Sequence, residues 1–241
     1  MNNYRELHIV MPVKDSIETV REALAALFAS SDLNWHFTLY NDFSTPENTE
    51  QLKALSKEYL FELVNWQERT KHPSPNYRFT LIDAQRKALE EQADLLIIES
   101  DVLVRHDTIA RMREALYSSE DKLGMVAAIT HDAEDKVNFP YNYAKLWRPR
   151  PTLTIKRFSF CCTMLTLEFL QAFPFEQLNP DKDWFDVTIS RKSLFFGFRN
   201  LLLMDTPVLH KPHSSRPWKQ LKYTHPIKYY WLKFTHRRDK I

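Results

Sequence analysis

Two carboxylates stand one residue apart at the end of an apolar run, in the segment LLIIESDVLV at residues 95–104. Residues i and i+2 of an extended chain project to the same side, so Glu99 and Asp101 can face one point. Two hard oxygen ligands suit Mg²⁺ or Mn²⁺, and such an ion would screen the charge of a diphosphate. In the structural alternative, Asp101 caps a turn and Glu99 pairs with a lysine. The pair alone leaves both interpretations open.

A second candidate site lies in the segment DKDWFDVTISRKSLFFGFRN, where Asp183 and Asp186 flank Trp184 at the start of a predicted helix. The helix dipole favours an ionised carboxylate at this position. A carboxylate beside an aromatic ring suits a sugar site, because the acid can act as a general base toward a hydroxyl while the ring packs on apolar C–H faces. Two N-terminal helix acids and a core tryptophan form the structural alternative.

A histidine follows the final predicted strand, in the segment VLHKPHSS. A lone histidine is more often structural, but a neutral His210 could complete the coordination of a metal bound by Glu99 and Asp101. The sequence has only two glycines. P-loops and dinucleotide-binding turns need clustered glycines to bring backbone N–H groups against phosphate, so the composition excludes those designs.

The order of apolar runs and helical periodicities predicts an α/β fold with a mostly parallel central sheet flanked by helices. Strands are expected at residues 7–13, 37–40, 95–98, 123–129, 158–166 and 201–204. Helices are expected after a cap at Asp15 or Ser16, at residues 49–63 and 81–91, from a cap at Asp107 to about residue 117, and at residues 186–196 with Gly197 ending the helix. Residues 65–77 are predicted to form a loop.

Ligands of parallel α/β sheets lie beyond the carboxyl ends of the strands, which is where Asp15, the Asn41-Asp42 pair and the Glu99–Asp101 step fall. The segment at residues 130–157 is irregular and rich in proline. Because it is too long for a simple connection, we expect it to be a substrate loop.

The 241-residue chain has a net charge of +2, but nine basic residues and one acidic residue lie between His210 and Ile241. A basic, aromatic tail on an acidic body indicates an anionic partner. If the tail is helical from Pro226, its aromatic and aliphatic residues form one stripe, which would enter a membrane interface or pack on the domain. The stripe comprises Ile227, Tyr230, Trp231 and Phe234. Nucleic acid is not expected as a partner, since the body is acidic and no recognised module occurs.

The cysteine content and the amino-terminal sequence favour a reduced, cytoplasmic setting. The two cysteines, Cys161 and Cys162, are adjacent, and we interpret them as small core residues rather than a disulfide or zinc site. The first residues lack the pattern of a signal peptide. The longest apolar-rich stretch, at residues 158–170, is shorter than the roughly 20 residues of a membrane span.

Taken in order, six motifs resemble those of the inverting family 2 glycosyltransferases of GT-A fold. They are MPVKDS, NDFST, ESD, SFCCTMLT, DWFDVTISRKSLFFGF and PVLH. The resemblance spans about residues 7–215, so we expect a single GT-A-like domain at residues 1–215 and a separate basic, aromatic tail at residues 216–241.

The resemblance implies a role for each matching residue. Asp186 would be the catalytic base, with Asp183 as the second candidate, and Arg191 would orient a carboxylate or phosphate near Trp184. Asp101 would be the main ligand of Mg²⁺ or Mn²⁺, with Glu99 and His210 assisting. The nucleotide-binding residues would be Pro12, Val13, Asp15, Asp42, whose carboxylate would bind the base, and Ser100.

Four positions depart from the family pattern. Asn41 and Glu99 stand where aspartates are usual, Thr188 occupies a place that is often acidic, and the helix at residues 83–91 lacks an Arg-Asn pair, for which Arg86 could substitute.

The expected function is metal-dependent, inverting transfer of a sugar from a UDP-linked donor to a hydroxyl of a glycan or lipid-linked acceptor. Such transfer would serve cell-surface polysaccharide synthesis at the inner face of the plasma membrane. Two alternatives stay open: a glycosyltransferase-like binding protein without activity, and a sugar nucleotidyltransferase. The second normally carries a Gly-rich, Arg-containing loop after the first strand, and MPVKDS has neither residue.

Overall fold

The computed structural model describes residues 4–32, 34–181, 184–211 and 225–235, without the side chains of residues 232–234. The strands are β1 (Leu7–Val13), β2 (Trp35–Asn41), β3 (Glu62–Asn65), β4 (Asp94–Ile98), β5 (Val102–Leu103), β6 (Leu123–His131), β7 (Pro151–Leu153), β8 (Cys162–Leu165) and β9 (Arg199–His210). The helices are α1 (Ile17–Phe28), α2 (Pro46–Tyr59), α3 (Trp66–Arg69), α4 (Tyr77–Glu90), α5 (Thr108–Tyr117), α6 (Leu167–Ala172), α7 (Phe185–Phe195) and α9 (Pro226–Thr235), with 3-10 turns η1 (Asn142–Ala144) and η2 (Phe175–Gln177).

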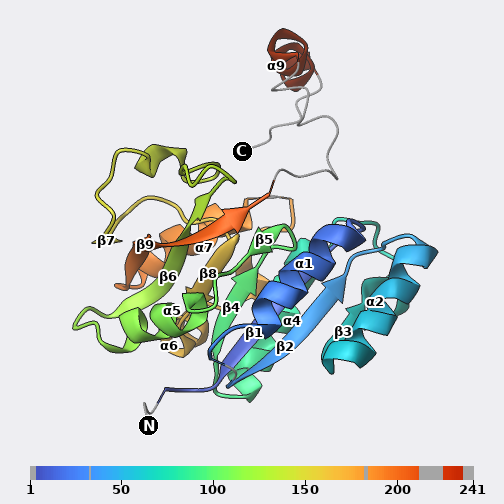
Figure 1. Ribbon diagram of the computed structural model, residues 1–241, viewed down its shortest axis with the longest axis horizontal. Coiled ribbons are helices and arrows are strands. Elements are labelled where there is room, and N and C mark those ends of the chain that lie inside the picture. Colours follow the sequence, from blue (N-terminus) through green and yellow to red (C-terminus); the bar gives the residue numbers. More distant parts are fainter. Residues whose placement is uncertain (1–3, 33, 182–183, 212–224, 236–241) are drawn as a thin grey trace.

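The strands form one sheet in the order β3-β2-β1-β4-β8-β6-β9-β5, and β7 pairs with β9 (Figure 1). β3, β2, β1 and β4 are parallel neighbours. β8 runs antiparallel between β4 and β6, and β9 is parallel to β6. Among the described residues, six strands therefore point the same way, while β5, β7 and β8 run opposite to them. The predicted α/β fold with a mostly parallel sheet is confirmed, and the carboxyl ends of β1, β2, β4 and β9 share one edge.

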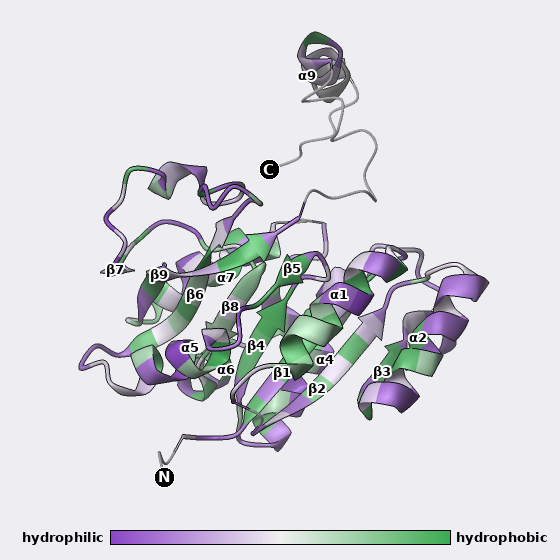
Figure 2. Cartoon of the chain, viewed as in Figure 1, coloured by the Kyte–Doolittle hydropathy of each residue, from purple (hydrophilic) through white to green (hydrophobic). Residues whose placement is uncertain are grey.

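Helices cover both faces of the sheet, and each face has its own apolar core. Leu24 of α1 and Met112 of α5 belong to one core, whereas Leu81 of α4 and Ile189 of α7 belong to the other. Figure 2 shows the central strands mainly in the colour of hydrophobic residues, while the helices carry both colours. This pattern explains why the central strands are continuous apolar runs in sequence, since both of their faces are buried.

Several element boundaries differ from the prediction. The helix expected to reach residue 63 ends at Tyr59, because Leu60 adopts a left-handed conformation with φ of 58° and the chain turns into β3. The loop expected at residues 65–77 contains α3 and the start of α4. The last strand, β9, has 12 residues instead of the predicted four, because it pairs with β5, β6 and β7, and such distant partners leave no local signal.

The expected caps differ from the structure at the first helix. Ser16 is the N-cap of α1 but has φ of 55° and makes no side-chain capping hydrogen bond. The Asp15 carboxylate serves α2 instead, accepting from Thr45 N at 2.8 Å and Asn48 Nδ2 at 3.0 Å. At the other end of the chain, Gly197 follows α7 with φ of 81°, as predicted.

The tail contains the predicted helix, α9, which begins at Pro226. Its side chains of Ile227, Tyr230 and Trp231 are exposed. The side chain of Phe234, the fourth member of the predicted stripe, lies outside the described part of the structure. The predicted domain boundary at residue 215 also lies outside it. No helix in the described ranges combines the length and apolar character that a bilayer span requires.

Candidate active site

The turn Glu99–Asp101 connects β4 to β5 at the shared strand edge. Val102 N donates to Glu99 O at 3.1 Å and closes this turn. β5 then pairs antiparallel with the end of β9, which places Val102 opposite His210. As a result, Asp101 Oδ2 lies 3.7 Å from His210 Nε2, and both side chains are buried. Two residues more than 100 positions apart are thus brought together as the sequence predicted.

A hydrogen bond fixes the orientation of the His210 ring. His210 Nδ1 lies 2.7 Å from the carbonyl oxygen of Phe139, which can only accept, so Nδ1 carries the ring hydrogen. In the neutral ring, Nε2 then presents a lone pair toward Asp101. Asn138 Nδ2 donates to His210 O at 3.1 Å and fixes the same backbone. Metal-binding histidines typically have this arrangement, with one nitrogen donating to a carbonyl and the other facing the ion.

Glu99, Cys161 and His210 each offer a ligand atom, and these atoms lie within 4.8 Å of one another. Cys161 Sγ donates to Glu99 Oε2 at 3.2 Å. Burial and the charge of Glu99 raise the pKa of the Cys161 thiol well above its ordinary value, so the thiol keeps its proton. Carboxylate oxygens and an imidazole nitrogen fit Mg²⁺ or Mn²⁺, whereas a protonated thiol does not bind such an ion. We therefore assign Cys161 to holding Glu99.

The sequence interpretation of the two cysteines is correct for Cys162, whose thiol packs in the core with its Sγ 3.7 Å from Met112 Sδ. For Cys161 the interpretation is incomplete. This residue lies immediately before β8, and although it is buried, its thiol also contacts Glu99 at the carboxyl end of β4.

Asp186 lies in the first turn of α7, where its Oδ1 accepts from Val187 N at 2.8 Å. Burial, reinforced by the charge of Glu99, raises the pKa of Asp186 to about 6 against the lowering effect of the Val187 N–H. Trp184 precedes the helix and is 38% exposed, and the Arg157 guanidinium lies 5.7 Å from its ring centre. The acid is therefore poised to take up a proton near neutral pH, two residues after an exposed tryptophan.

Tyr77, at the start of α4, is a neighbour of the candidate acids that the sequence did not reveal. Its ring lies 6.3 Å from that of Phe185, and its buried hydroxyl makes no hydrogen bond with any described residue. Burial and the charges of Glu99 and Asp186 raise the pKa of Tyr77 well above its ordinary value. The hydroxyl thus remains a donor. Sequence alone offered little signal, because the position fell at the end of a predicted loop.

Asp42 follows β2 and is already bound by the chain. Its Oδ2 accepts from Ser74 Oγ at 2.8 Å and Asn76 N at 2.9 Å, and its Oδ1 accepts from Asn76 Nδ2 at 2.7 Å. Asp42 N in turn donates to Val13 O at 2.8 Å, next to the half-buried Pro12. A carboxylate has about four lone-pair positions, and these contacts use three of them. Asp42 thus organises the loop before α4.

Asn41 shows why an amide stands where an aspartate is usual. Its buried Nδ2 donates to Thr49 Oγ1 at 3.0 Å and to Asn65 Oδ1 at 2.9 Å, which a carboxylate cannot do. Nearby, burial raises the pKa of Asp15, but the N–H groups of Thr45 and Asn48 outweigh it and hold that pKa below its ordinary value. Asp15 is therefore ionised near neutral pH and ties the loop after β1 to α2.

The remaining predicted residues are placed as follows. Ser100 is half-buried between the two acids of the turn. Arg191 is exposed and follows Asp186 by five residues, which is about 140° around a helix, so the two side chains do not share a face. Asp183 lies outside the described residues.

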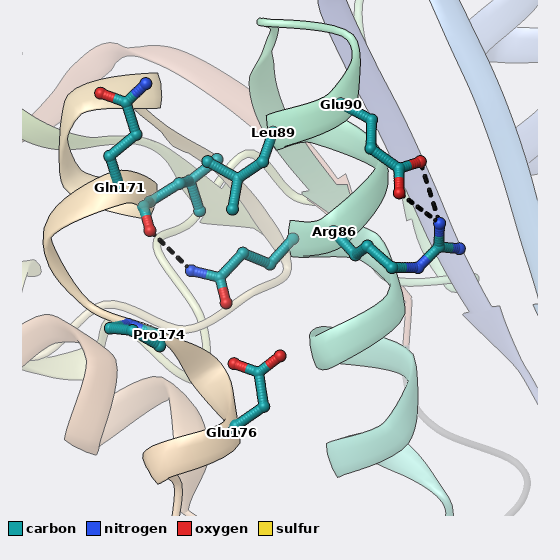
Figure 3. Close-up of a pocket in the computed structure, with 8 residues that line it drawn as sticks. Arg86, Leu89, Glu90, Gln171, Pro174 and Glu176 are labelled. Atoms are coloured by element: carbon teal, nitrogen blue, oxygen red, sulfur yellow. Dashed lines mark hydrogen bonds and ion pairs between the residues drawn. The ribbon is translucent and has the colours of Figure 1, made fainter.

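A pocket of about 360 Å³ lies between α4 and α6, away from this site (Figure 3). Arg86 lines it and binds Glu90 at 2.8 Å and Asp83 at 2.7 Å. Arg86 is more than two helical turns from Tyr77, so it does not replace the missing Arg-Asn pair at the strand edge.

No protein-family model matches the chain, and no curated protein matches it in sequence. Solved structures match it in fold. Residues 1–349 of S. aureus TarS in complex with UDP-GlcNAc share 12% identity with it, cover 88% of this chain and 60% of their own, and give a TM-score of 0.68. GalNAc-T7 with UDP, GalNAc and Mn²⁺ shares 13% identity over 87% of this chain and 44% of its own, with a TM-score of 0.64.

A third match is the mannosyltransferase PcManGT from Pyrobaculum calidifontis in complex with GDP-Man and Mn²⁺. It shares 16% identity over 99% of this chain and 66% of its own, with a TM-score of 0.59. The chain spans between 44% and 66% of the length of these proteins. The expected GT-A fold is confirmed by these likenesses.

Proposed function

We propose that this protein is a metal-dependent, inverting glycosyltransferase that moves a sugar from a nucleotide-sugar donor to an acceptor hydroxyl. One observation carries the proposal: Asp186, with its pKa raised to about 6, lies within electrostatic reach of Glu99, at the strand edge where Asp101 meets His210. A glycosyltransferase-like protein that only binds its ligand needs no carboxylate with a raised pKa. A general base does.

Glu99, Asp101 and His210 are the residues that would hold Mg²⁺ or Mn²⁺. When bound, the ion would stabilise the negative charge of the departing nucleoside diphosphate. The chain prepares this site in two ways: the Phe139 carbonyl turns His210 Nε2 toward Asp101, and the Cys161 thiol holds one oxygen of Glu99.

Asp186 performs the proton transfer in this proposal. Val187 N–H donates to Oδ1, so we assign Oδ2 as the oxygen that takes the acceptor's proton. The acceptor oxygen then forms a bond to the anomeric carbon, the bond from that carbon to the diphosphate oxygen breaks, and the electron pair leaves with the diphosphate. Attack opposite the leaving group inverts the anomeric configuration. Trp184 offers an exposed ring on which a sugar can pack.

The donor is proposed to be UDP-linked. The titles of two matched structures name UDP or UDP-GlcNAc, and a third names GDP-Man. The pocket would be formed by the ends of β1 and β2 and by the turn after β4, through residues Pro12, Val13, Asp15, Asp42 and Ser100.

The acceptor is proposed to be a glycan or a lipid-linked sugar used in cell-surface polysaccharide synthesis. Support comes from the exposed Ile227, Tyr230 and Trp231 of α9, which suit the interface of an anionic membrane. The loop after β6 contributes the Phe139 carbonyl to the site and is the segment best placed to choose an acceptor.

The test is release of nucleoside diphosphate from a panel of UDP- and GDP-sugars with Mn²⁺, with and without glycan acceptors. The full chain should act on at least one donor. Asp186→Asn and Asp101→Asn should lower turnover by about 100-fold or more. Asp181→Asn, which changes an exposed acid near α7, should keep full activity. Full activity in both site variants would overturn the proposal.

A further inference from the structure

A second cluster of side chains that could hold a metal ion lies at the opposite edge of the sheet. His8 of β1 and His36 of β2 are register partners near the amino ends of their strands, and Glu91 follows the end of α4. His8 Nδ1 lies 2.8 Å and His36 Nδ1 3.0 Å from the same oxygen, Glu91 Oε2. One ligand atom from each residue lies within 4.8 Å of the others.

The proton on His8 can be placed from its neighbours. Thr38 Oγ1 donates its single hydrogen to Glu62 Oε2 at 3.0 Å, because the carboxylate can only accept. The contact of 3.1 Å between Thr38 Oγ1 and His8 Nε2 must then be a donation from the histidine. Lys87 Nζ binds Glu62 at 2.5 Å and fixes the end of this chain of hydrogen bonds. A neutral His8 therefore carries its hydrogen on Nε2.

With that hydrogen on Nε2, the lone pair of His8 Nδ1 faces the Glu91 carboxylate. Two acceptors at 2.8 Å repel unless a cation lies between them. A metal cation bound by both groups would remove this repulsion and leave the His8 hydrogen on Nε2, where Thr38 Oγ1 accepts it.

We propose that His8, His36 and Glu91 form a Zn²⁺ site, separate from the candidate active site. Two imidazole nitrogens and one carboxylate are a ligand set that Zn²⁺ uses with water as a fourth ligand. His36 is 60% exposed and borders a cavity of about 530 Å³, which gives that water access. Thr38 holds the outer nitrogen of His8, as partners of metal-binding histidines usually do.

This site is independent of the proposed catalytic metal. β1 and β2 each have seven residues, about 23 Å of extended chain, and separate the two histidines from Asp15 and Asp42 at the opposite strand edge. Bound Zn²⁺ would join the amino ends of two strands to the carboxyl end of α4.

Zn²⁺ binding to the full chain should be measured by calorimetry after chelator treatment, in an Asp101→Asn background that weakens the other site. One equivalent of Zn²⁺ should bind and raise the melting temperature, since it binds only the folded state. His36→Ala and Glu91→Gln should each weaken binding by more than about 100-fold, and Thr38→Val by about 10- to 100-fold. His106→Ala, which removes an exposed histidine outside the cluster, should bind as tightly as the parent.

Circular dichroism without metal establishes that each variant folds, and Co²⁺ gives a second readout. Visible absorption bands of a four-coordinate Co²⁺ complex should appear in the Asp101→Asn chain and be absent from Asp101→Asn/His36→Ala. The proposal is overturned if the Asp101→Asn chain binds no Zn²⁺, which would make the cluster a hydrogen-bonded ion pair only. Equal Zn²⁺ affinity in folded His36→Ala and Glu91→Gln would overturn it as well.

Discussion

Replacing Asp186 by asparagine should stabilise the protein while it abolishes transfer. Burial raises the pKa of this carboxyl to about 6, compared with 3.8 for an ordinary aspartate. Because a tenfold change in proton affinity corresponds to about 1.4 kcal/mol, ionised Asp186 lowers the free energy of unfolding by about 3 kcal/mol above pH 6. Asparagine has no charge to bury and still accepts from Val187 N. We expect a gain of about 2 to 3 kcal/mol at pH 8, roughly 4 to 12 °C in melting temperature for a chain of this size.

The pH dependence of the stability difference between Asp186→Asn and the parent distinguishes the cost of burying a charge from other effects of the substitution. For an acid whose pKa is raised on folding, the destabilisation is complete above the folded pKa and absent below the unfolded pKa. The advantage of Asp186→Asn should thus fall to about 1 kcal/mol at pH 4.5. Thermal melts of both proteins at the two pH values provide the measurement, with Asp181→Asn as an exposed control expected to stay within about 0.5 kcal/mol. An Asp186→Asn protein no more stable than the parent at pH 8 would refute the buried, ionised state of Asp186.

Three further outcomes are expected. The kcat/KM of transfer should fall about tenfold for each pH unit below about 6, because Asp186 must be ionised to accept a proton, and a flat profile to pH 5 would exclude it as the base. His210→Gln should raise the Mn²⁺ concentration for half-maximal activity by about 10-fold or more, measured by metal titration, and an unchanged requirement would remove His210 from the metal site. Gly124→Ala should destabilise the fold by about 1 to 3 kcal/mol, because the added Cβ would clash with Ser193 Oγ and lie 2.8 Å from Phe198 Cβ. Chemical unfolding measures this change, and an unchanged denaturation midpoint would contradict the packing.

The parts of the site that follow strand ends could be predicted from sequence. Glu99 and Asp101 end an apolar run, and His210 follows another, so the topology of parallel strands alone places them at one edge. The structure brings Asp101 and His210 to 3.7 Å without any local sequence signal linking them. Asp186 was selected for a different reason: it is an acid at a predicted helix start near a tryptophan, and its role as catalytic base was implied by the family resemblance.

The parts that depend on distant backbone could not be predicted. The Phe139 carbonyl that orients His210 belongs to an irregular loop, and a carbonyl oxygen has no sequence signature. Cys161 looked like a core residue in sequence, because its hydrogen bond to Glu99 arises only from the antiparallel pairing of β8 with β4. Asp15 was assigned to its own helix, but positive φ at Asp15 and Ser16 turns its carboxylate toward α2 instead.

The long strand β9 determines which face of the sheet carries His210. It pairs Leu203 with Ala128 and then Pro207 with Ile129, so residues 204–206 are additional to their partner strand. Beyond that irregularity, side chains alternate between buried and half-buried positions up to the buried His210. Inserting or deleting a single residue there would reverse the alternation and turn position 210 to the other face, whereas a change of two residues would preserve it. Length variation in this segment is therefore expected in even steps, a parity rule that can be checked in related chains.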